Sequence, residues 1–184
     1  MNKSLLSLLF LALIAVSCKK EINPFLISKH NIGLLTDSTQ VKDLELVFPN
    51  DSIVKSIKGD EYSGNTNDIN IFEKGGKELL ILAPDQVLDS TAVIESVQIM
   101  DSRYRTEKGI STLSTFKDID QNYKISRINN LINSIVITVD EINASFTIDK
   151  KELPSDLRFD LSLKIEKIQI PDKAKIKYFF VYWN

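Results

Sequence analysis

Cysteine, histidine and tryptophan are nearly missing from this chain of 184 residues, since each occurs once. A single cysteine excludes both an internal disulfide framework and a thiolate zinc site, because each of these needs several cysteines. With His30 as the only histidine, a metal site would consist almost wholly of carboxylates, which is unusual for zinc. We therefore expect no metal and no cofactor, and we interpret His30 as a loop or packing residue.

Glycine and proline are also scarce, and neither sign of charge dominates. Six Gly and five Pro leave no room for a long flexible linker. Lys and Arg number 23 against 25 Asp and Glu, and the few arginines form no dense block. Proteins that bind nucleic acid usually carry a basic stripe, so we exclude this class of partner. The lysines alternate with apolar residues, as they do on the solvated faces of strands.

Long apolar runs are absent except near the start of the chain, where Leu5–Val16 follows the charged segment Met1–Lys3. As a helix this run would cover about 18 Å at about 1.5 Å per residue, which is too short for a hydrocarbon core of about 30 Å. The run ends in Ala15-Val16-Ser17-Cys18. A charged start, an apolar middle and small residues before a cleavage point are the three parts of a secretory signal peptide.

The position of Cys18 directly after Ser17 resembles the lipobox of bacterial lipoproteins, although Ala15 stands where that motif commonly has Leu. In this family the signal peptide is cut before the cysteine, which then carries diacylglycerol and an acyl chain such as palmitate on its new amino terminus. The resemblance implies a signal peptide over residues 1–17, lipidation at Cys18 and a tether over residues 18–24. The alternative is an ordinary signal peptide that happens to contain a cysteine, which would leave an unpaired thiol in an oxidising compartment.

The resemblance also implies a location. It places the protein at the cell envelope, with the membrane as a partner through the lipid anchor. Lys19 follows the cysteine, so the acidic signal that retains some lipoproteins in the inner membrane is absent. We therefore expect the outer membrane.

Two pairs of similar segments recur in the same order along the rest of the chain, which predicts an internal duplication. We place repeat 1 at residues 25–101 and repeat 2 at residues 102–184. The paired segments are Gly33–Glu45 with Gly109–Asp120, extended to Phe48 and Tyr123, and Ile94–Asp101 with Ile165–Asp172.

Each predicted repeat begins with a short helix and continues with strands. The pairs Ser38-Thr39 and Ser114-Thr115 precede apolar residues at helical spacing, and we expect their hydroxyls to cap these helices. Alternating or continuous apolar runs predict the strands. Two hairpin turns are expected between them, at the two glycines of Lys74–Lys77 and at Asp140–Asn143. The fold class is therefore predicted as α+β, mostly antiparallel β-sheet with one short helix per copy. The predicted strands are Ile69–Glu73, Glu78–Leu82, Ala92–Met100, Ser134–Val139, Ala144–Ile148, Arg158–Ile170 and Lys175–Trp183.

The wider sequence resembles envelope lipoproteins of unknown function from flavobacteria-type bacteria. The segments Leu35–Thr39, Tyr104–Gly109 and Phe146–Pro154 carry this resemblance, which covers nearly the whole chain after the signal peptide. Many of those relatives have Gly before the Ser-Thr pair, where this chain has Asp37 and Leu113. The resemblance implies an envelope location and assigns no chemistry.

Clusters of acidic residues are the next candidates for chemistry. The acids within residues 60–68, which include Asp60, Glu61 and Asp68, lack the ligand spacing of a calcium loop, so we expect a polar connection. The helix acids Asp118 and Asp120, like Asp43 and Glu45, lie two apart and point to different sides of a helix. We interpret them as solvated.

Nucleophilic catalysis has one weak motif. Ser-x-x-Lys occurs at Ser17, Ser52 and Ser114, without the companion motifs that penicillin-binding proteins carry. Ser114 is better explained as a helix cap. We therefore expect no catalytic residue, and we predict that the protein is not an enzyme.

Two readings of the function remain. The favoured one is a non-catalytic binding or scaffolding module, with an envelope protein or a polysaccharide as partner. The alternative is a small envelope hydrolase in which Glu95 and Glu166 meet in a cleft between the repeats. The aromatic segment Tyr178–Trp183 is either an exposed edge for a partner or a final strand covered on both faces, with Trp183 in the core.

Overall fold

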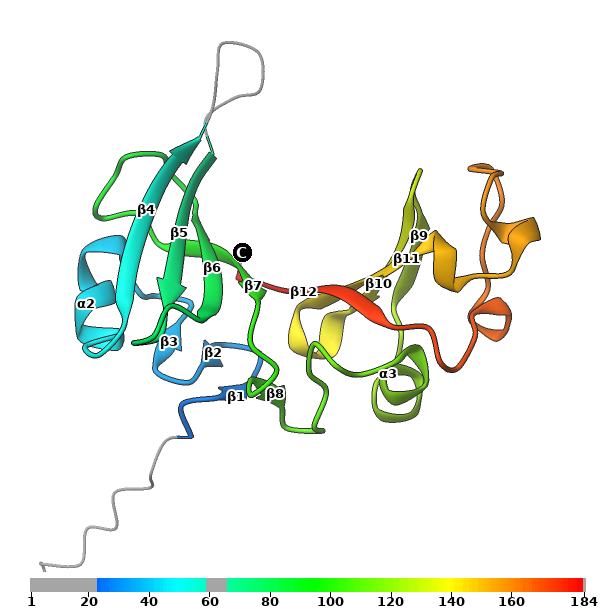
Figure 1. The fold of residues 1–184 in the computed structure, drawn as a ribbon, viewed down its shortest axis with the longest axis horizontal. Helices are drawn as coiled ribbons and strands as arrows, with labels where there is room; N and C mark the ends of the chain where they lie inside the picture. Colours follow the sequence, from blue (N-terminus) through cyan, green and yellow to red (C-terminus); the bar gives the residue numbers. More distant parts are fainter. Residues whose placement is uncertain (1–22, 59–65, 184) are drawn as a thin grey trace, which may run out of the picture.

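The computed structural model describes residues 23–58 and 66–183, which form an α+β structure dominated by strands (Figure 1). This agrees with the predicted fold class. Eight strands form one antiparallel sheet in the order β4-β5-β6-β7-β12-β11-β10-β9. They are β4 (Ser52–Lys58), β5 (Thr66–Phe72), β6 (Glu78–Pro84), β7 (Ile94–Ile99), β9 (Arg127–Asn130), β10 (Ser134–Val139), β11 (Ala144–Asp149) and β12 (Ile176–Tyr182).

A second, small sheet and several short helices complete the described part. The small sheet has the order β3-β2-β1-β8, and its β1–β8 pair is parallel. Its strands are β1 (Leu26–Ile27), β2 (Asn31–Ile32), β3 (Leu35–Thr36) and β8 (Arg105–Thr106). The helices are η1 (Val41–Asp43), α2 (Leu44–Val47), α3 (Phe116–Asn122), η2 (Asp140–Ile142), η3 (Lys150–Glu152), η4 (Ser155–Leu157) and η5 (Lys167–Gln169). Within residues 23–58 and 66–183, no helix has the length and hydropathy needed to cross a bilayer.

The predicted hairpins form where the turn residues demand them. Between β5 and β6, Gly75 and Gly76 have φ values of +111° and +89°, which residues with a side chain rarely adopt. The backbone N–H of Glu73 donates to the carbonyl of Lys77 across this turn, at 2.9 Å. Between β10 and β11, Asn143 ends η2 in the left-handed conformation, which asparagine tolerates better than most residues.

Among the described residues, the helices and the small sheet cover one face of the eight-stranded sheet. The core side chains alternate along the strands, and Phe146 on β11 pairs with Phe179 on β12 at a ring separation of 4.6 Å. In Figure 1, α2, α3 and the small strands lie on the outer side of the curved sheet. On the other face, the rings of Tyr178, Phe180 and Tyr182 follow one another at 6.4 and 6.1 Å.

This placement corrects the expectation that Tyr178–Trp183 is a final strand covered on both faces. The strand β12 is central, because it lies between β7 and β11. Its buried side chains Phe179 and Val181 face the core, whereas Tyr178 and Tyr182 stay largely exposed. Trp183 is buried as expected, and its indole N–H donates to the carbonyl of Lys29 at 3.1 Å.

The two halves of the chain have the same order of elements and several matching hydrogen bonds. In each half a short helix precedes four strands that run from the outer edge of the sheet to its centre, and the halves meet where β7 pairs with β12. Each donor in the first half precedes its counterpart in the second half by the same number of residues. The matches are Thr36 N to Thr39 Oγ1 with Ser111 N to Ser114 Oγ, Val41 N to Ala92 O with Phe116 N to Ala174 O, Lys42 N to Ser90 O with Lys117 N to Asp172 O, and Phe48 N to Leu44 O with Tyr123 N to Ile119 O.

One predicted strand is wrong. Residues 158–170 form no strand but an irregular segment that ends in η5. The apolar alternation there reflects separate anchors: Ile165 and Ile170 are buried in the core, while Ile168 is exposed. The similarity of Ile94–Asp101 to Ile165–Asp172 is therefore not matched in structure, because the first segment contains β7 and the second contains η5.

The expected helix caps hold only for α3. The backbone N–H of Thr115 donates to the carboxylate of Asp118 at 2.7 Å, and the side chain of Thr115 accepts a hydrogen bond from the backbone N–H of Asp118. This reciprocal arrangement is a capping box, so Asp118 is not simply solvated. Ser114 and Thr39 instead accept hydrogen bonds inside the preceding turns, and α2 has no side-chain cap.

Candidate functional site

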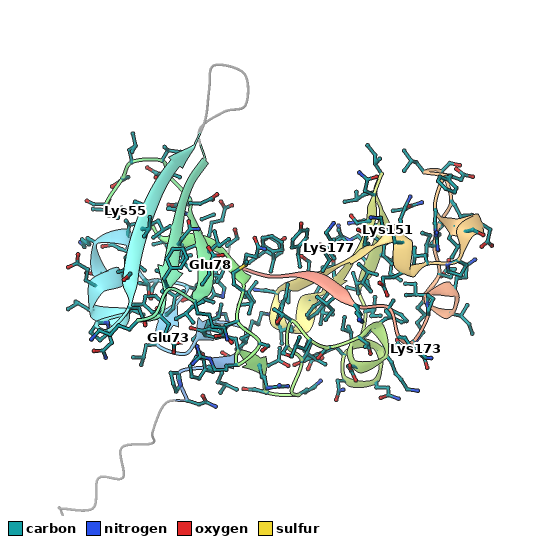
Figure 2. The ribbon with its side chains drawn as sticks, in the orientation of Figure 1. Lys55, Glu73, Glu78, Lys151, Lys173 and Lys177 are labelled. Carbon is teal, nitrogen blue, oxygen red and sulfur yellow. The ribbon has the colours of Figure 1, made fainter. Side chains whose placement is uncertain are left out.

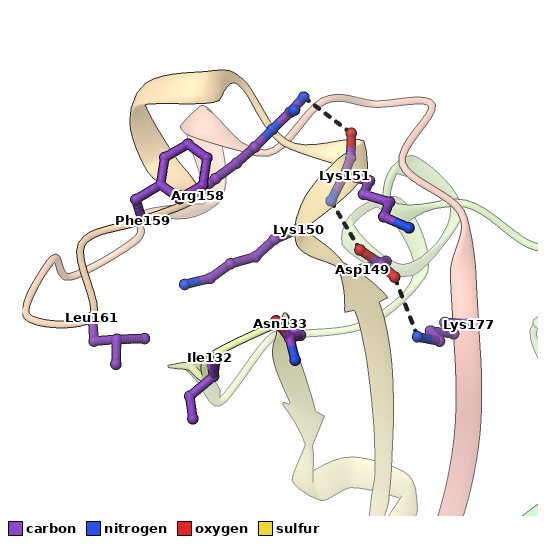
Figure 3. A pocket seen from close by; sticks show the side chains of 9 residues that line it. All are labelled: Ile132, Asn133, Asp149, Lys150, Lys151, Arg158, Phe159, Leu161 and Lys177. Atoms are coloured by element: carbon purple, nitrogen blue, oxygen red, sulfur yellow. Dashed lines mark hydrogen bonds and ion pairs between the residues drawn. The ribbon is translucent and has the colours of Figure 1, made fainter.

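A pocket of about 640 Å³ lies beyond the ends of β11 and β12 (Figure 3). Three segments form most of its wall: the turn between β9 and β10, the end of β11 with η3, and the irregular segment that begins at Arg158. Lys177 of β12 completes the lining. The pocket therefore belongs to the second half of the chain.

The side chain of Lys150 is the unusual feature of this pocket. Only 4% of Lys150 is exposed, and its Nζ is buried without a hydrogen-bond partner among the described residues. The backbone explains the burial: Lys150 directly follows β11, and its N–H donates to the carbonyl of Asn133 at 3.0 Å. Its side chain then extends toward Phe159, Leu161 and Ile132 (Figure 3). Burying an ammonium group without a hydrogen-bond partner is costly.

The lining carries more positive than negative charge. Four cationic residues, Lys150, Lys151, Arg158 and Lys177, contribute to it, against the one carboxylate of Asp149. That carboxylate accepts a hydrogen bond from the backbone of Lys151 and pairs with Lys177 Nζ at 3.2 Å. These two hydrogen bonds lower the pKa of Asp149 below its ordinary value. The carboxylate of Asp149 therefore stays ionised and pairs with Lys177.

Arg158 fixes the wall of the pocket through backbone contacts. Its Nε donates to the carbonyl of Leu153 at 2.8 Å, and its Nη2 donates to the carbonyl of Lys151 at 3.1 Å. These bonds tie the irregular segment to η3. The guanidinium group thus stabilises the pocket wall through hydrogen bonds, whereas the ammonium group of Lys150 makes no hydrogen bond within the described residues.

A second set of hydrogen bonds holds the irregular segment against β9. The amide nitrogen of Asn130 donates to the carbonyls of Asp160 and Leu163, both at 2.9 Å. The side chain and the backbone of Ser162 donate to the carboxylate of Asp160. These bonds, and more weakly the charge of Lys150, lower the pKa of that carboxyl group. The pocket wall is therefore built by specific polar contacts at both of its ends.

The residues expected to act together in a hydrolase lie on different elements. Glu95 is exposed on β7, near the centre of the sheet. Glu166 lies outside the sheet at the start of η5, where Lys164 pairs with it at 2.9 Å. Glu166 lines a smaller pocket with residues 125–128 and 164–167, and Glu95 is not part of that lining.

The other candidates from the sequence have structural explanations or fall outside the description. His30 is exposed, and its Nδ1 lies 2.8 Å from Asp37 Oδ2. In the described ranges, no group of three or more His, Cys, Asp or Glu side chains is placed to hold a metal ion. Cys18 and the acids at positions 60 and 61 lie outside the described residues.

Two of the four acidic side chains on the helices make structural contacts. Asp118 caps α3, as described above, and Asp120 pairs with Lys167 of η5 at 3.0 Å. Glu45 is exposed on α2 and Asp43 is half-buried before it. Of these four carboxylates, only Asp118 therefore contradicts the interpretation as solvated faces.

Sequence reasoning missed Lys150 because lysine is rarely buried. The segment Asp149-Lys150-Lys151-Glu152 has the composition of a solvated turn, and nothing local distinguishes the second lysine from the first. The signal that identifies Lys150 is its burial, which depends on the distant loops around Ile132 and Phe159.

Comparisons with known proteins define the fold and leave the site unassigned. The sequence matches no family of known proteins, and it matches no curated protein. Among solved structures, the chain is similar to the crystal structure of the uncharacterized protein YfeY from Escherichia coli. The TM-score is 0.58 at 12% sequence identity, over 85% of this chain and 98% of that one. At this level of identity the likeness shows a shared fold alone.

Proposed function

We propose that the protein is a lipid-anchored component of the cell envelope whose folded part binds an envelope ligand through an anionic group, without catalysing a reaction. The observation that carries this proposal is the buried Nζ of Lys150, which has no partner in the described residues and lies in a pocket lined by three further cations. A buried ammonium group normally donates hydrogen bonds. An anionic ligand would supply the missing acceptor.

The lipid anchor rests on Ala15-Val16-Ser17-Cys18 and the apolar run before it. A single fourteen-carbon chain holds a protein to a bilayer only marginally, whereas two or three acyl chains hold it almost permanently. Replacing Cys18 by Ser should abolish cleavage of the signal peptide and retention in the membrane. Fractionation with detergent phase separation tests this, and a variant that stays in the membrane fraction like the parent contradicts the anchor.

Binding without catalysis is the better-supported reading of the pocket. Its lining contains no serine, cysteine or histidine, so it offers no hydroxyl or thiol nucleophile beside an imidazole base. The hydrolase alternative needs Glu95 and Glu166 in one cleft, and Glu95 is not part of the pocket lining to which Glu166 belongs. We therefore assign the pocket to recognition of an anion.

We also propose that the two halves, residues 25–101 and 102–184, are tandem repeats of one ancestral unit. The matching hydrogen bonds of the two helix starts support this, because Val41 and Phe116 both donate to an alanine carbonyl just before the last strand of their half. The donors in both helix starts are separated from their counterparts by the same number of residues. The pocket around Lys150 belongs to the second copy alone, since the position after β6 in the first copy holds Asp85.

Binding of a small anion tests the pocket directly. The full lipidated chain, held in phosphatidylcholine nanodiscs, is melted in inorganic phosphate and in chloride at equal ionic strength. A ligand that binds only the folded state raises the melting temperature by mass action. We expect phosphate to raise the melting temperature of the parent and of Lys173→Gln, but not of Lys150→Gln. Lys173 is a suitable control because it is exposed and lies apart from Lys151 and Lys177 (Figure 2). An equal rise in all three proteins contradicts the anion site.

A further inference from the structure

Large apolar side chains surround the mouth of the pocket that contains Lys150. Ile132, Phe159 and Leu161 are 73%, 86% and 53% exposed, and all three line this pocket. Single exposed apolar residues are ordinary on protein surfaces. Three of them around one buried cation form a pocket with a charged floor and an apolar rim.

The rim comes from two separate segments that face each other. Ile132 belongs to the turn between β9 and β10, whereas Phe159 and Leu161 belong to the irregular segment that Asn130 and Arg158 hold in place. In Figure 3 the side chain of Lys150 extends between Phe159 on one side and Leu161 and Ile132 on the other. A ligand whose charged end reaches the ammonium group would therefore place the rest of its body against the rim.

The charges restrict which end of the ligand enters. Arg158 is bound to backbone carbonyls, and Lys177 is paired with Asp149. Lys150 is thus the cation of the lining that is both buried and without a partner in the described residues. A phosphate or carboxylate group fits this position, because each is an anionic oxygen acceptor for an ammonium donor.

We propose that the ligand of this pocket is an amphiphile with a phosphate or carboxylate head group and an alkyl chain, in which Lys150 binds the head group and Ile132, Phe159 and Leu161 contact the chain. The inference rests on the proposed anion site and adds the apolar part of the ligand. Such amphiphiles are constituents of the membrane to which the lipid anchor would hold the protein.

Matched pairs of probes separate the head group from the chain. The full chain in phosphatidylcholine nanodiscs is titrated with octyl phosphate against inorganic phosphate, and with octanoate against acetate, with empty nanodiscs as the blank. The measured quantity is the concentration that gives half of the maximal rise in melting temperature. Burial of only two methylene groups against the rim favours the alkyl probe by about tenfold. We expect at least this difference in one of the two pairs.

Variants assign the two parts of the ligand to the two parts of the pocket. Lys150→Gln should remove the response to the alkyl anion, whereas Phe159→Ser should weaken it about fivefold or more and leave the response to the small anion unchanged. Ile168→Ser, at a side chain that is 92% exposed and outside the pocket, should behave like the parent. Because Phe159 is exposed, its replacement leaves the core intact.

The outcomes distinguish failure of this inference from failure of the anion site. If the small anions act as strongly as the alkyl anions and still depend on Lys150, the anion site holds and the amphiphile is refuted. If Phe159→Ser and Ile168→Ser weaken the alkyl probe equally, the probe acts through the bilayer and the amphiphile is again refuted. If no probe depends on Lys150, both proposals fail.

Discussion

Removal of the carboxylate of Asp101 should destabilise the protein in a way that depends on pH. Asp101 follows β7, its side chain is fully buried, and its carboxylate pairs with Arg103 Nη2 at 2.6 Å and with Lys77 Nζ at 3.0 Å. Arg103 also donates its Nε to Asp101 and its Nη1 to Glu73, at 2.9 and 2.8 Å, and its guanidinium lies 4.6 Å from the ring centre of Phe25. The carboxylate thus connects the end of β7 to Lys77 in the turn before β6 and to Arg103.

The magnitude follows from the pKa of Asp101. Burial alone would raise this pKa, but hydrogen bonds from Arg103 and Lys77 outweigh burial and lower it to about 2 from the ordinary 3.8. The folded state therefore favours the ionised form, which contributes stability above about pH 4 that is lost as the pH falls toward 2. At about 1.4 kcal/mol per pKa unit, this contribution is about 2 kcal/mol. Asp101→Asn should remove at least this much at pH 7, since it also leaves Arg103 without its main partner.

Urea unfolding of residues 19–184, followed by the fluorescence of Trp183, measures the effect. The free energy of unfolding should differ between the parent and Asp101→Asn by a constant amount from pH 7 to pH 5. That difference should then shrink by about 2 kcal/mol by pH 2, because the parent becomes protonated as well. Glu73→Gln is the control, since Glu73 is half-exposed and exposed ion pairs contribute less than about 1 kcal/mol. A difference that does not change between pH 5 and pH 2 would refute the assignment.

Two further predictions concern packing and backbone conformation, and both are checked by the same unfolding measurement. Phe116→Ala removes a buried side chain of α3 and should lower the free energy of unfolding by about 3–5 kcal/mol. Asp118→Ala loses only a helix cap and should lower it by about 1 kcal/mol. The reverse order would show that α3 is not a core element. Gly33→Ala should cost more than Gly109→Ala, because both have positive φ but only at Gly33 would the new Cβ clash with the carbonyl of Pro24. Equal losses at the two glycines would mean that backbone strain, at about 1–2 kcal/mol, is the whole effect.

Much of the secondary structure could be predicted from the sequence where the signal is local. The strand β10 has the predicted bounds Ser134–Val139, because its alternation matches a sheet with one covered face. The turn at Gly75 and Gly76 was predicted from its glycines. The strands β4 and β9 were missed, since they lie at the sheet edges and half of their pattern is polar.

The arrangement of the strands and the pocket could not be predicted from local pattern. The pairing of β7 with β12 joins Val97 to Val181, and no nearby residue specifies such a distant partner. Residues 158–170 show why alternation alone can predict a strand wrongly. The apolar side chains there have the spacing of a strand, but they belong to a loop, in which some are buried in the core and others lie at the mouth of the pocket. Lys150 is distinctive only once that loop covers it, so its burial was not visible in a segment rich in lysine.

The central position of β12 has a consequence for how the chain folds. Because β12 follows all the other strands of this sheet in the chain, the pairing of Phe180 with Gln98 closes a loop of many residues, and contacts of such long range slow folding. During synthesis the eight-stranded sheet therefore stays open until β12 has emerged. Shortening the chain at β12 should thus separate two incomplete half-sheets rather than trim an edge.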